Sequence, residues 1–344
     1  LENRGKSLVV SGSDDINVQI IINHINILLK NYSQTISTSL KSNVFSSKNT
    51  DILNLVSDMN KGDVDVIMFW DTNPMYTFPN KNQFSSALKK VPTKISFSES
   101  KDETAILCDY ICPKTNYLES WGDMNPYTGL YTLQQPTISP LFNSRQVQDG
   151  LLIWMKSKES YFSYLTSFFK KNISNNWNQI LHDGFIDKGT LSTEMSIKSI
   201  DKNISKKIIH SSTNSIELEL YLKGSLGYGL YSSNPWLQEL PDVISKVTWD
   251  NYLTISPSHA KELNLKNWHV SNGALDGNIV NLTINNTILR CPVYIQPGQA
   301  HGTLGLVFGY GRTETGKAGK NVGINAFTVY NNFDKINTDK ISIE

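Results

Sequence analysis

The most constraining feature of this sequence is the apolar run at residues 63–70, Asp-Val-Asp-Val-Ile-Met-Phe-Trp, which ends in the polar turn 71–74. A run of this length with a turn-forming end is typical of a buried strand of a parallel sheet. The sequence before it, residues 51–60, has Leu and Val at helical spacing. The sequence after it predicts a short helix from 84 to 89, a strand from 92 to 97 and a helix from 102 toward 109. Alternation of strands and helices predicts an α/β, doubly wound and mostly parallel sheet.

The first 30 residues predict another strand and helix. Residues 8–10 are Leu-Val-Val, a polar turn that can cap a helix follows, and residues 16–29 are periodic in apolar side chains. Residues 172–215 are rich in Lys, Ser and Asn and lack strong periodicity, which is typical of a domain boundary.

Beyond that boundary the sequence predicts strands. Runs of alternating or β-branched residues occupy 215–221, 281–284, 288–295 and 303–308, between Gly and Asn turns. One helix interrupts them, with Ser256 as N-cap and Pro257 at the first helical position. We therefore predict an α/β domain at residues 1–212 and a small β-barrel domain at 213–344.

Length and charge narrow the classes of function. A chain of 344 residues exceeds the roughly 250 that one core supports, so two domains are expected. The net charge of +1 gives no long-range field for nucleic acid, and no apolar stretch approaches the roughly 20 residues of a membrane span. The chain starts with Leu1 and shows no signal peptide, so we expect it to be part of a longer or processed protein.

The sequence predicts no metal site and no catalytic group. The three cysteines, Cys108, Cys112 and Cys291, are too few for a disulfide framework, and Cys108 and Cys112 lack a second ligand pair nearby. The six histidines have no metal-binding spacing, and neither a nucleophile elbow nor a dinucleotide fingerprint is present.

Four polar residues and a proline, at the ends of the predicted parallel strands, are the candidate binding residues. Open α/β sheets bind ligands at this carboxyl edge, where the sequence places a set of five residues: Asp71, Asn73, Pro74, Glu103 and Thr104. A structural turn at Asn-Pro and a helix cap at residues 102–104 are the alternatives. The long irregular stretch 113–145, with Glu119, Trp121, Asn125 and Arg145, is a second candidate because long loops are usually functional.

Several segments, in order, resemble the carboxyl-terminal half of the molybdopterin oxidoreductase family, from residue 7 to about 330. The strand and Asn-Pro turn at 64–74, Glu103-Thr-Ala105 and Glu119 look like its α/β motifs, and 234–241, 255–260 and 296–298 like those of its double-psi barrel. The resemblance implies an α/β domain and a double-psi barrel that together hold one half of a bis-molybdopterin guanine dinucleotide cofactor.

The residues of five motifs resemble one branch of the family more closely, the iron-sulfur subunit of bacterial alternative complex III. That complex oxidises quinol. These motifs are 69–74, 108–113, 116–121, 134–140 and 247–252. The branch implies a respiratory oxidoreductase subunit on the periplasmic side of the inner membrane, with other subunits as partners. It also implies that this part has lost the molybdopterin cofactor, while iron-sulfur clusters lie elsewhere in the full-length chain.

Departures from the family pattern agree with cofactor loss. Ser98 stands where cofactor-bearing members have an acid, and Leu130 replaces the Arg of a Gly-Arg pair, so a bidentate anion binder is absent. The leading hypothesis is that the chain is a scaffold domain without a cofactor. Stoichiometric molybdenum in the native complex would contradict this hypothesis. The alternatives are the cofactor-binding half of an active bis-molybdopterin guanine dinucleotide enzyme, and a small nucleotide-binding module that uses Asp71, Asn73 and Glu103.

Overall fold

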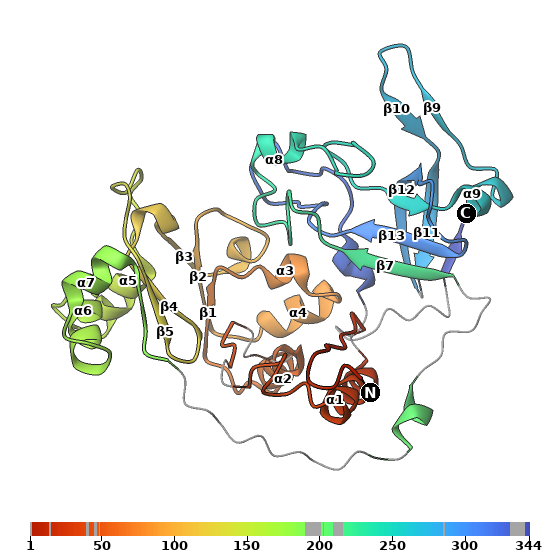
Figure 1. Ribbon diagram of the computed structural model, residues 1–344. Helices are drawn as coiled ribbons and strands as arrows, with labels where there is room; N and C mark the ends of the chain where they lie inside the picture. Colours follow the sequence, from red (N-terminus) through yellow and green to blue (C-terminus); the bar gives the residue numbers. More distant parts are fainter. Residues whose placement is uncertain are drawn as a thin grey trace. The chain divides into compact units, whose positions relative to one another are not determined.

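Figure 1 shows a computed structural model of the chain, which describes residues 2–13, 15–38, 41–44, 47, 49–189, 201, 203–208, 216–284, 286–330 and 341–344. The chain divides into two compact units, described separately below. The first unit comprises Leu1–Ile52 and Cys112–Ile209, and the second comprises Leu53–Ile111 and His210–Glu344. This division into units does not test the domain boundary expected at residue 212, which stays a prediction.

The first unit begins with helix α1 (Ile16–Leu28), as predicted, and Asp15 caps it by accepting from the Asn17 N–H. The strand predicted at residues 8–10 is wrong. The side chain of buried Asn26 accepts from the Val9 N–H at 3.0 Å and donates to the Val9 carbonyl at 2.8 Å. One amide side chain therefore takes the place of a partner strand along this segment.

Helices packed on a small antiparallel sheet form the rest of the first unit. Its elements are η2 (Tyr117–Glu119), β4 (Gly122–Tyr127), β5 (Leu130–Gln134), α5 (Val147–Trp154), α6 (Tyr161–Asn172), α7 (Trp177–Asp183), β6 (Phe185–Asp187) and η3 (Ile204–Lys207). Helix α6 buries Tyr161, Leu165 and Phe169, which follow each other at one-turn spacing and so share a face.

Two sequence predictions for the first unit are wrong in part. Residues 113–145 are not irregular throughout, because β4 and β5 form an antiparallel hairpin whose turn contains Gly129 at φ 94°. In the expected boundary segment, α7 and β6 are regular structure that joins the core. Residues 190–200, 202 and 209–215 of that segment lie outside the described residues.

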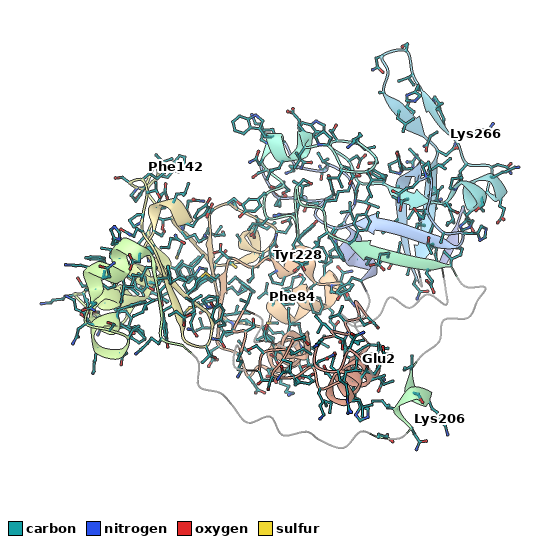
Figure 2. All side chains as sticks on the ribbon, viewed as in Figure 1. Glu2, Phe84, Phe142, Lys206, Tyr228 and Lys266 are labelled. Carbon is teal, nitrogen blue, oxygen red and sulfur yellow. The ribbon has the colours of Figure 1, made fainter. Side chains whose placement is uncertain are left out.

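The α/β part of the second unit contains the predicted parallel pair. Its elements are α2 (Asn49–Lys61), β1 (Val66–Trp70), α3 (Pro74–Thr77), α4 (Lys81–Leu88), β2 (Thr93–Ser98), η1 (Ala105–Leu107) and β3 (Tyr110–Pro113), with sheet order β1-β2-β3. The first residues of α2 and the last of β3 belong to the first unit. Strands β1 and β2 are parallel. Phe84 of α4, labelled in Figure 2, packs against Phe69 of β1 at 6.4 Å between ring centroids.

The helix predicted from residue 102 to 109 is only the single 3-10 turn η1. Asp102 does cap this turn, since its carboxylate accepts from the Thr104 and Ala105 N–H groups. The chain then leaves the helical path, because the Asp109 N–H donates to the Lys94 carbonyl of β2 at 2.9 Å. Pairing with a strand therefore outweighs the helical tendency of this segment.

The β-rich part of the second unit is a six-stranded mixed sheet in the order β14-β11-β12-β8-β13-β7 (Figure 1). Its strands are β7 (Glu217–Tyr221), β8 (Leu253–Ile255), β11 (Ile279–Ile284), β12 (Thr287–Ile295), β13 (Thr303–Val307) and β14 (Ile341–Ile343). A hairpin, β9 (Asn267–His269) and β10 (Leu275–Gly277), and three short helices, α8 (Pro235–Glu239), α9 (Pro257–Glu262) and η4 (Ala326–Val329), complete it.

The predictions for this part are confirmed at the level of strands and helix. All four predicted strand runs form strands, and α9 starts with the Ser256 side chain accepting from the His259 N–H and with Pro257 at its first position. The coarse fold class, α/β with a parallel sheet followed by a β-rich part, is confirmed. Among the described residues, no helix is long and apolar enough to cross a membrane.

Candidate functional site

Three of the predicted edge residues lie together at the carboxyl ends of β1 and β2. Asn73 follows β1, and Glu103 and Thr104 follow β2, so parallel pairing brings them to one edge of the sheet. The Asn73 Nδ2 donates to Glu103 Oε2 at 2.7 Å, and the Thr104 hydroxyl donates to Asn73 Oδ1, also at 2.7 Å. The two strand ends are therefore joined by their own side chains.

A residue that sequence reasoning did not select, Arg312, completes this cluster. Its Nε lies 3.0 Å from both carboxylate oxygens of Glu103, and its Nη2 donates to Oε2 at 2.8 Å. The backbone N–H groups of Thr313 and Glu314 donate to Glu103 Oε1 at 2.7 and 3.0 Å. Glu103 and Arg312 are only 8% and 5% exposed, so this is a buried, forked ion pair. We call the four residues Asn73, Glu103, Thr104 and Arg312 the edge cluster.

The other donors of Arg312 are also directed at the protein. Nη1 donates to the Gly229 carbonyl and Nη2 to the Glu314 carbonyl at 3.2 Å. The guanidinium carbon lies 4.8 Å from the centre of the Tyr76 ring, and the Tyr76 hydroxyl donates to the Tyr310 carbonyl at 2.7 Å. The arginine thus ties the ends of β1 and β2 to the loop that follows β13.

Glycine geometry explains how the loop can reach the cluster. Gly311 has φ 70°, and a Cβ added there would lie 2.2 Å from the Asn325 nitrogen. Only glycine fits this backbone and this space, so it sets the direction in which Arg312 leaves the chain. The available sequence signal was a lone arginine, one of four in the chain, between Gly311 and a polar run.

The electrostatics of the edge cluster favour a permanent anion at Glu103. Burial opposes ionisation, but the Arg312 guanidinium, the Glu314 backbone amide and Asn73 outweigh it and lower the pKa of Glu103 to about 2. For Tyr76, burial raises the pKa well above its usual range despite the nearby Arg312. Burial also raises the pKa of Asp102, against the backbone amides that it caps. The cluster is therefore a neutralised ion pair in a dry setting.

The two remaining predicted residues have different settings from the edge cluster. Asp71 is exposed and has φ 53°, in the left-handed region. Pro74 is buried at the first position of α3, where its fixed φ suits a helix start. Any role of the five residues in binding a cofactor stays a prediction.

The second candidate, the stretch 113–145, uses its polar residues for structure. Glu119 accepts from the Asn116 and Leu141 N–H groups at 3.0 and 2.9 Å, and Asn125 donates to the Leu130 carbonyl at 2.7 Å. Trp121 packs against Phe162 with ring centroids 4.6 Å apart. These contacts shape the hairpin and its approach to the helices.

The cysteines are free thiols, Cys291 buried and Cys108 and Cys112 partly exposed. Burial first, then Asp102 and Asp109, raise the pKa of Cys108 to about 11, so its thiol is protonated at neutral pH. Among the residues that the structure describes, no group of three or more His, Cys, Asp or Glu side chains could hold a metal ion.

A cavity of about 520 Å³ in the second unit is a feature that the sequence did not reveal. Tyr221, Thr254, Gln299 and Gly305 line it, and a buried ion pair, Lys223 to Asp242 at 3.3 Å, lies at its wall. The loop residues Val243 and Ile244 also line it and are among the most exposed apolar residues of the chain.

Comparison with known proteins supports the family resemblance. No family model matches the chain. Over 90 residues it is 34% identical to a menaquinone reductase, molybdopterin-binding-like subunit, of Nitratidesulfovibrio vulgaris, covering 25% of this chain and 13% of that protein. Over 81 residues it is 30% identical to the assimilatory nitrate reductase catalytic subunit of Bacillus subtilis, covering 24% of this chain and 11% of that protein.

The fold has a solved counterpart. Acetylene hydratase from Pelobacter acetylenicus superposes with a TM-score of 0.52 and 13% identity over 74% of this chain and 39% of that one. The resemblance to the molybdopterin oxidoreductase family is therefore confirmed, for a part of the chain in sequence and for most of it in fold. The matches span a small share of each curated relative, 13% and 11% of their lengths.

Proposed function

We propose that this chain is part of a respiratory oxidoreductase subunit in which it serves as a scaffold without its own cofactor. The more specific identity that we propose is the iron-sulfur subunit of an alternative complex III, a quinol-oxidising complex on the periplasmic side of the bacterial inner membrane. The β-rich part would be a double-psi barrel, and the partners would be the other subunits of the complex. Similarity to a subunit named menaquinone reductase, molybdopterin-binding-like, supports this proposal.

The edge cluster is the observation that carries the scaffold role. A pterin guanine dinucleotide brings a pyrophosphate, which needs cations and N–H donors at the sheet edge. In this chain the buried cation, Arg312, is neutralised by Glu103, and the side-chain amide of Asn73 and the backbone amides of Thr313 and Glu314 donate to the same carboxylate. Paired with the ionised Glu103, Arg312 offers no net positive charge to a pyrophosphate at this place. The edge cluster is therefore better suited to connecting the strand ends with the loop after β13 than to binding the cofactor.

The test is a composition measurement on the native complex that contains the full-length protein. Molybdenum and tungsten are quantified by plasma mass spectrometry, and guanine nucleotides by chromatography after acid release. We expect far less than one equivalent of each per subunit, together with quinol-dependent electron transfer by the complex. One or two equivalents of guanine nucleotide with molybdenum or tungsten would overturn the proposal.

A second candidate is the cofactor-binding half of an active bis-molybdopterin guanine dinucleotide oxidoreductase. The similarity to the catalytic subunit of an assimilatory nitrate reductase favours it. The same composition measurement separates the two, because this candidate requires stoichiometric metal and nucleotide. A nucleotide-binding module, the third hypothesis from the sequence, would instead give heat with GDP in calorimetry of the full-length protein.

A further inference from the structure

Two histidines from different elements of the second unit lie against each other. His259 belongs to α9, and His301 belongs to the loop of residues 296–302 that joins β12 to β13. Their ring centroids are 5.0 Å apart, with 38° between the ring planes. His301 Nε2 lies 3.1 Å from both carboxylate oxygens of Glu262, the last residue of α9. We call His259, Glu262 and His301 the histidine cluster.

The two rings differ in their access to water. His259 is only 6% exposed, and its Nδ1 is buried without a hydrogen-bond partner among the described residues. The side chains of His301 and Glu262 are 52% and 63% exposed. A charged imidazole donates from both ring nitrogens, so a buried nitrogen without an acceptor is tolerated far better in the neutral ring. His259 is therefore the member of the cluster that acid should disturb.

The charges around His259 act in the same direction. Burial lowers the pKa of His259 below the ordinary 6.5, and a positive charge on His301 lowers it further. Glu262 raises this pKa but does not outweigh the other two causes. In the described part of the chain, these two residues are the titratable groups that act on His259, one from its own helix and one from the facing loop. A proton on His301 thus makes a proton on the buried His259 still less favourable.

The loop that carries His301 is also part of the wall of the 520 Å³ cavity. Gln296 and Gln299 of this loop line the cavity, and the Gln299 side chain donates to the Thr254 carbonyl of β8 at 3.1 Å. A movement of the loop away from α9 would therefore change the shape of the cavity.

We propose that the histidine cluster is an acid-sensitive contact, which holds the loop 296–302 on α9 at neutral pH and releases it in mild acid. Opening gives His259 access to water, where it can take up a proton. Because the pKa of His259 is lower in the closed state than the ordinary 6.5, the closed state is fully stable above about pH 6.5 and loses stability as the pH falls below it. One proton taken up on opening raises the open population by up to about tenfold per pH unit.

Native-state hydrogen exchange of the full-length protein between pH 7 and 5 tests the proposal. Protection factors, which correct for the intrinsic effect of pH, are measured for the backbone amides of Gln299 and Thr303, which donate within the loop. We expect them to fall by at least about fivefold over this range. The Val293 amide of β12, which donates to the Asn278 carbonyl, is the internal control and should keep its protection within about twofold.

Two variants assign the effect to one ring. His259→Phe keeps an aromatic ring on α9 but cannot take up a proton, so its loop amides should keep the same protection from pH 7 to 5. His269→Phe, at an exposed histidine of β9, is the matched control and should behave as the unsubstituted protein does. Constant loop protection in the unsubstituted protein would overturn the proposal, and so would an equal fall in the His259→Phe variant.

The pKa of His259 itself gives a readout that needs no variant. Slow exchange of the imidazole C2 hydrogen, followed across pH by mass spectrometry, reports this pKa in the folded full-length protein and in urea. We expect the folded value to lie below the value in urea, since the closed cluster disfavours the charged ring. A folded value equal to or above the value in urea would contradict the proposal.

Discussion

Two buried ion pairs of the second unit are similar in exposure and different in construction. The side chains of Arg312 and Glu103 are 6% and 10% exposed, and those of Lys223 and Asp242 are 9% and 12% exposed. The Nε and Nη2 atoms of Arg312 both donate to the Glu103 carboxylate, at nitrogen–oxygen distances of 2.8 to 3.0 Å. Lys223 approaches Asp242 as a single ammonium at 3.3 Å. Burial alone therefore does not define what an ion pair does.

The difference lies in where the remaining hydrogen bonds go. Glu103 also accepts from Asn73 and from the Thr313 and Glu314 amides, so it joins parts of the chain more than 200 residues apart. Asp242 accepts from the Ile244 and Ser245 amides, and so shapes its own turn beside the cavity. One pair connects distant segments, while the other fixes a local loop.

The largest expected effect is that of Arg312→Met, which leaves the Glu103 carboxylate buried without its cation. The α/β and β-rich parts of the second unit should lose about 3–5 kcal/mol of stability. Native-state hydrogen exchange of β1 and β13 measures this loss in the full-length protein. Arg290→Met, at an exposed arginine of β12, is the control and should change stability by less than about 0.5 kcal/mol. Equal effects of the two variants would contradict the role of Arg312.

Acid should weaken the pair of Glu103 and Arg312. Because the folded pKa of Glu103 is about 2, below the ordinary 4.5, its stabilisation is complete above about pH 5 and is lost as the pH falls toward 2. The loss should amount to about 3 kcal/mol, the free-energy equivalent of lowering the pKa of Glu103 from 4.5 to about 2. Unfolding by urea between pH 6 and 2.5 measures it, and Glu103→Gln should flatten the profile. A profile unchanged in the Glu103→Gln variant would refute this assignment.

Lys223→Met should cost less than Arg312→Met, about 2 kcal/mol. The Asp242 carboxylate keeps its two backbone amide donors after the change, and those amides together with Lys223 lower its pKa against burial. Urea unfolding at pH 7 compares the two variants directly. A cost of Lys223→Met equal to or above that of Arg312→Met would remove the distinction between the pairs.

The smallest effects concern the tyrosines that contact each cation. Tyr76→Phe keeps the ring beneath Arg312 but loses the hydrogen bond to the Tyr310 carbonyl, and Tyr252→Phe loses those to Lys223 and Ser245. Each should cost about 1 kcal/mol in thermal or urea unfolding. A cost of more than about 3 kcal/mol for Tyr76→Phe would mean that its hydroxyl has a further role.

Local patterns made much of the fold predictable from the sequence. The run at residues 63–70 correctly predicts a parallel strand, although only alternate residues of β1 are buried. Ser256 with Pro257 correctly predicts the start of α9. Residues 8–10 have the composition of a strand but lie along the side chain of Asn26, a contact that no local pattern reveals. Strand formation depends on an available partner, so composition alone was insufficient there.

The candidate site was only partly predictable, because local sequence patterns do not reveal contacts between distant parts of the chain. The rule that polar residues meet at the carboxyl edge of a parallel sheet brought Asn73, Glu103 and Thr104 together correctly. Arg312 lies 209 residues after Glu103, and only the fold of the β-rich part makes them neighbours. Without Arg312, the edge residues would be interpreted as polar groups available to bind a ligand. With Arg312, they form a hydrogen-bonded cluster that connects two parts of the second unit.

A double-mutant cycle of Glu103→Gln and Arg312→Met tests most directly whether the edge cluster is a structural joint. Hydrogen exchange of β1 and β13 in the full-length protein gives the stability of both single variants and of the double variant. The account predicts a coupling energy of about 2 kcal/mol or more, since either substitution alone leaves the other charge buried. Additive effects, within about 0.5 kcal/mol, would contradict it.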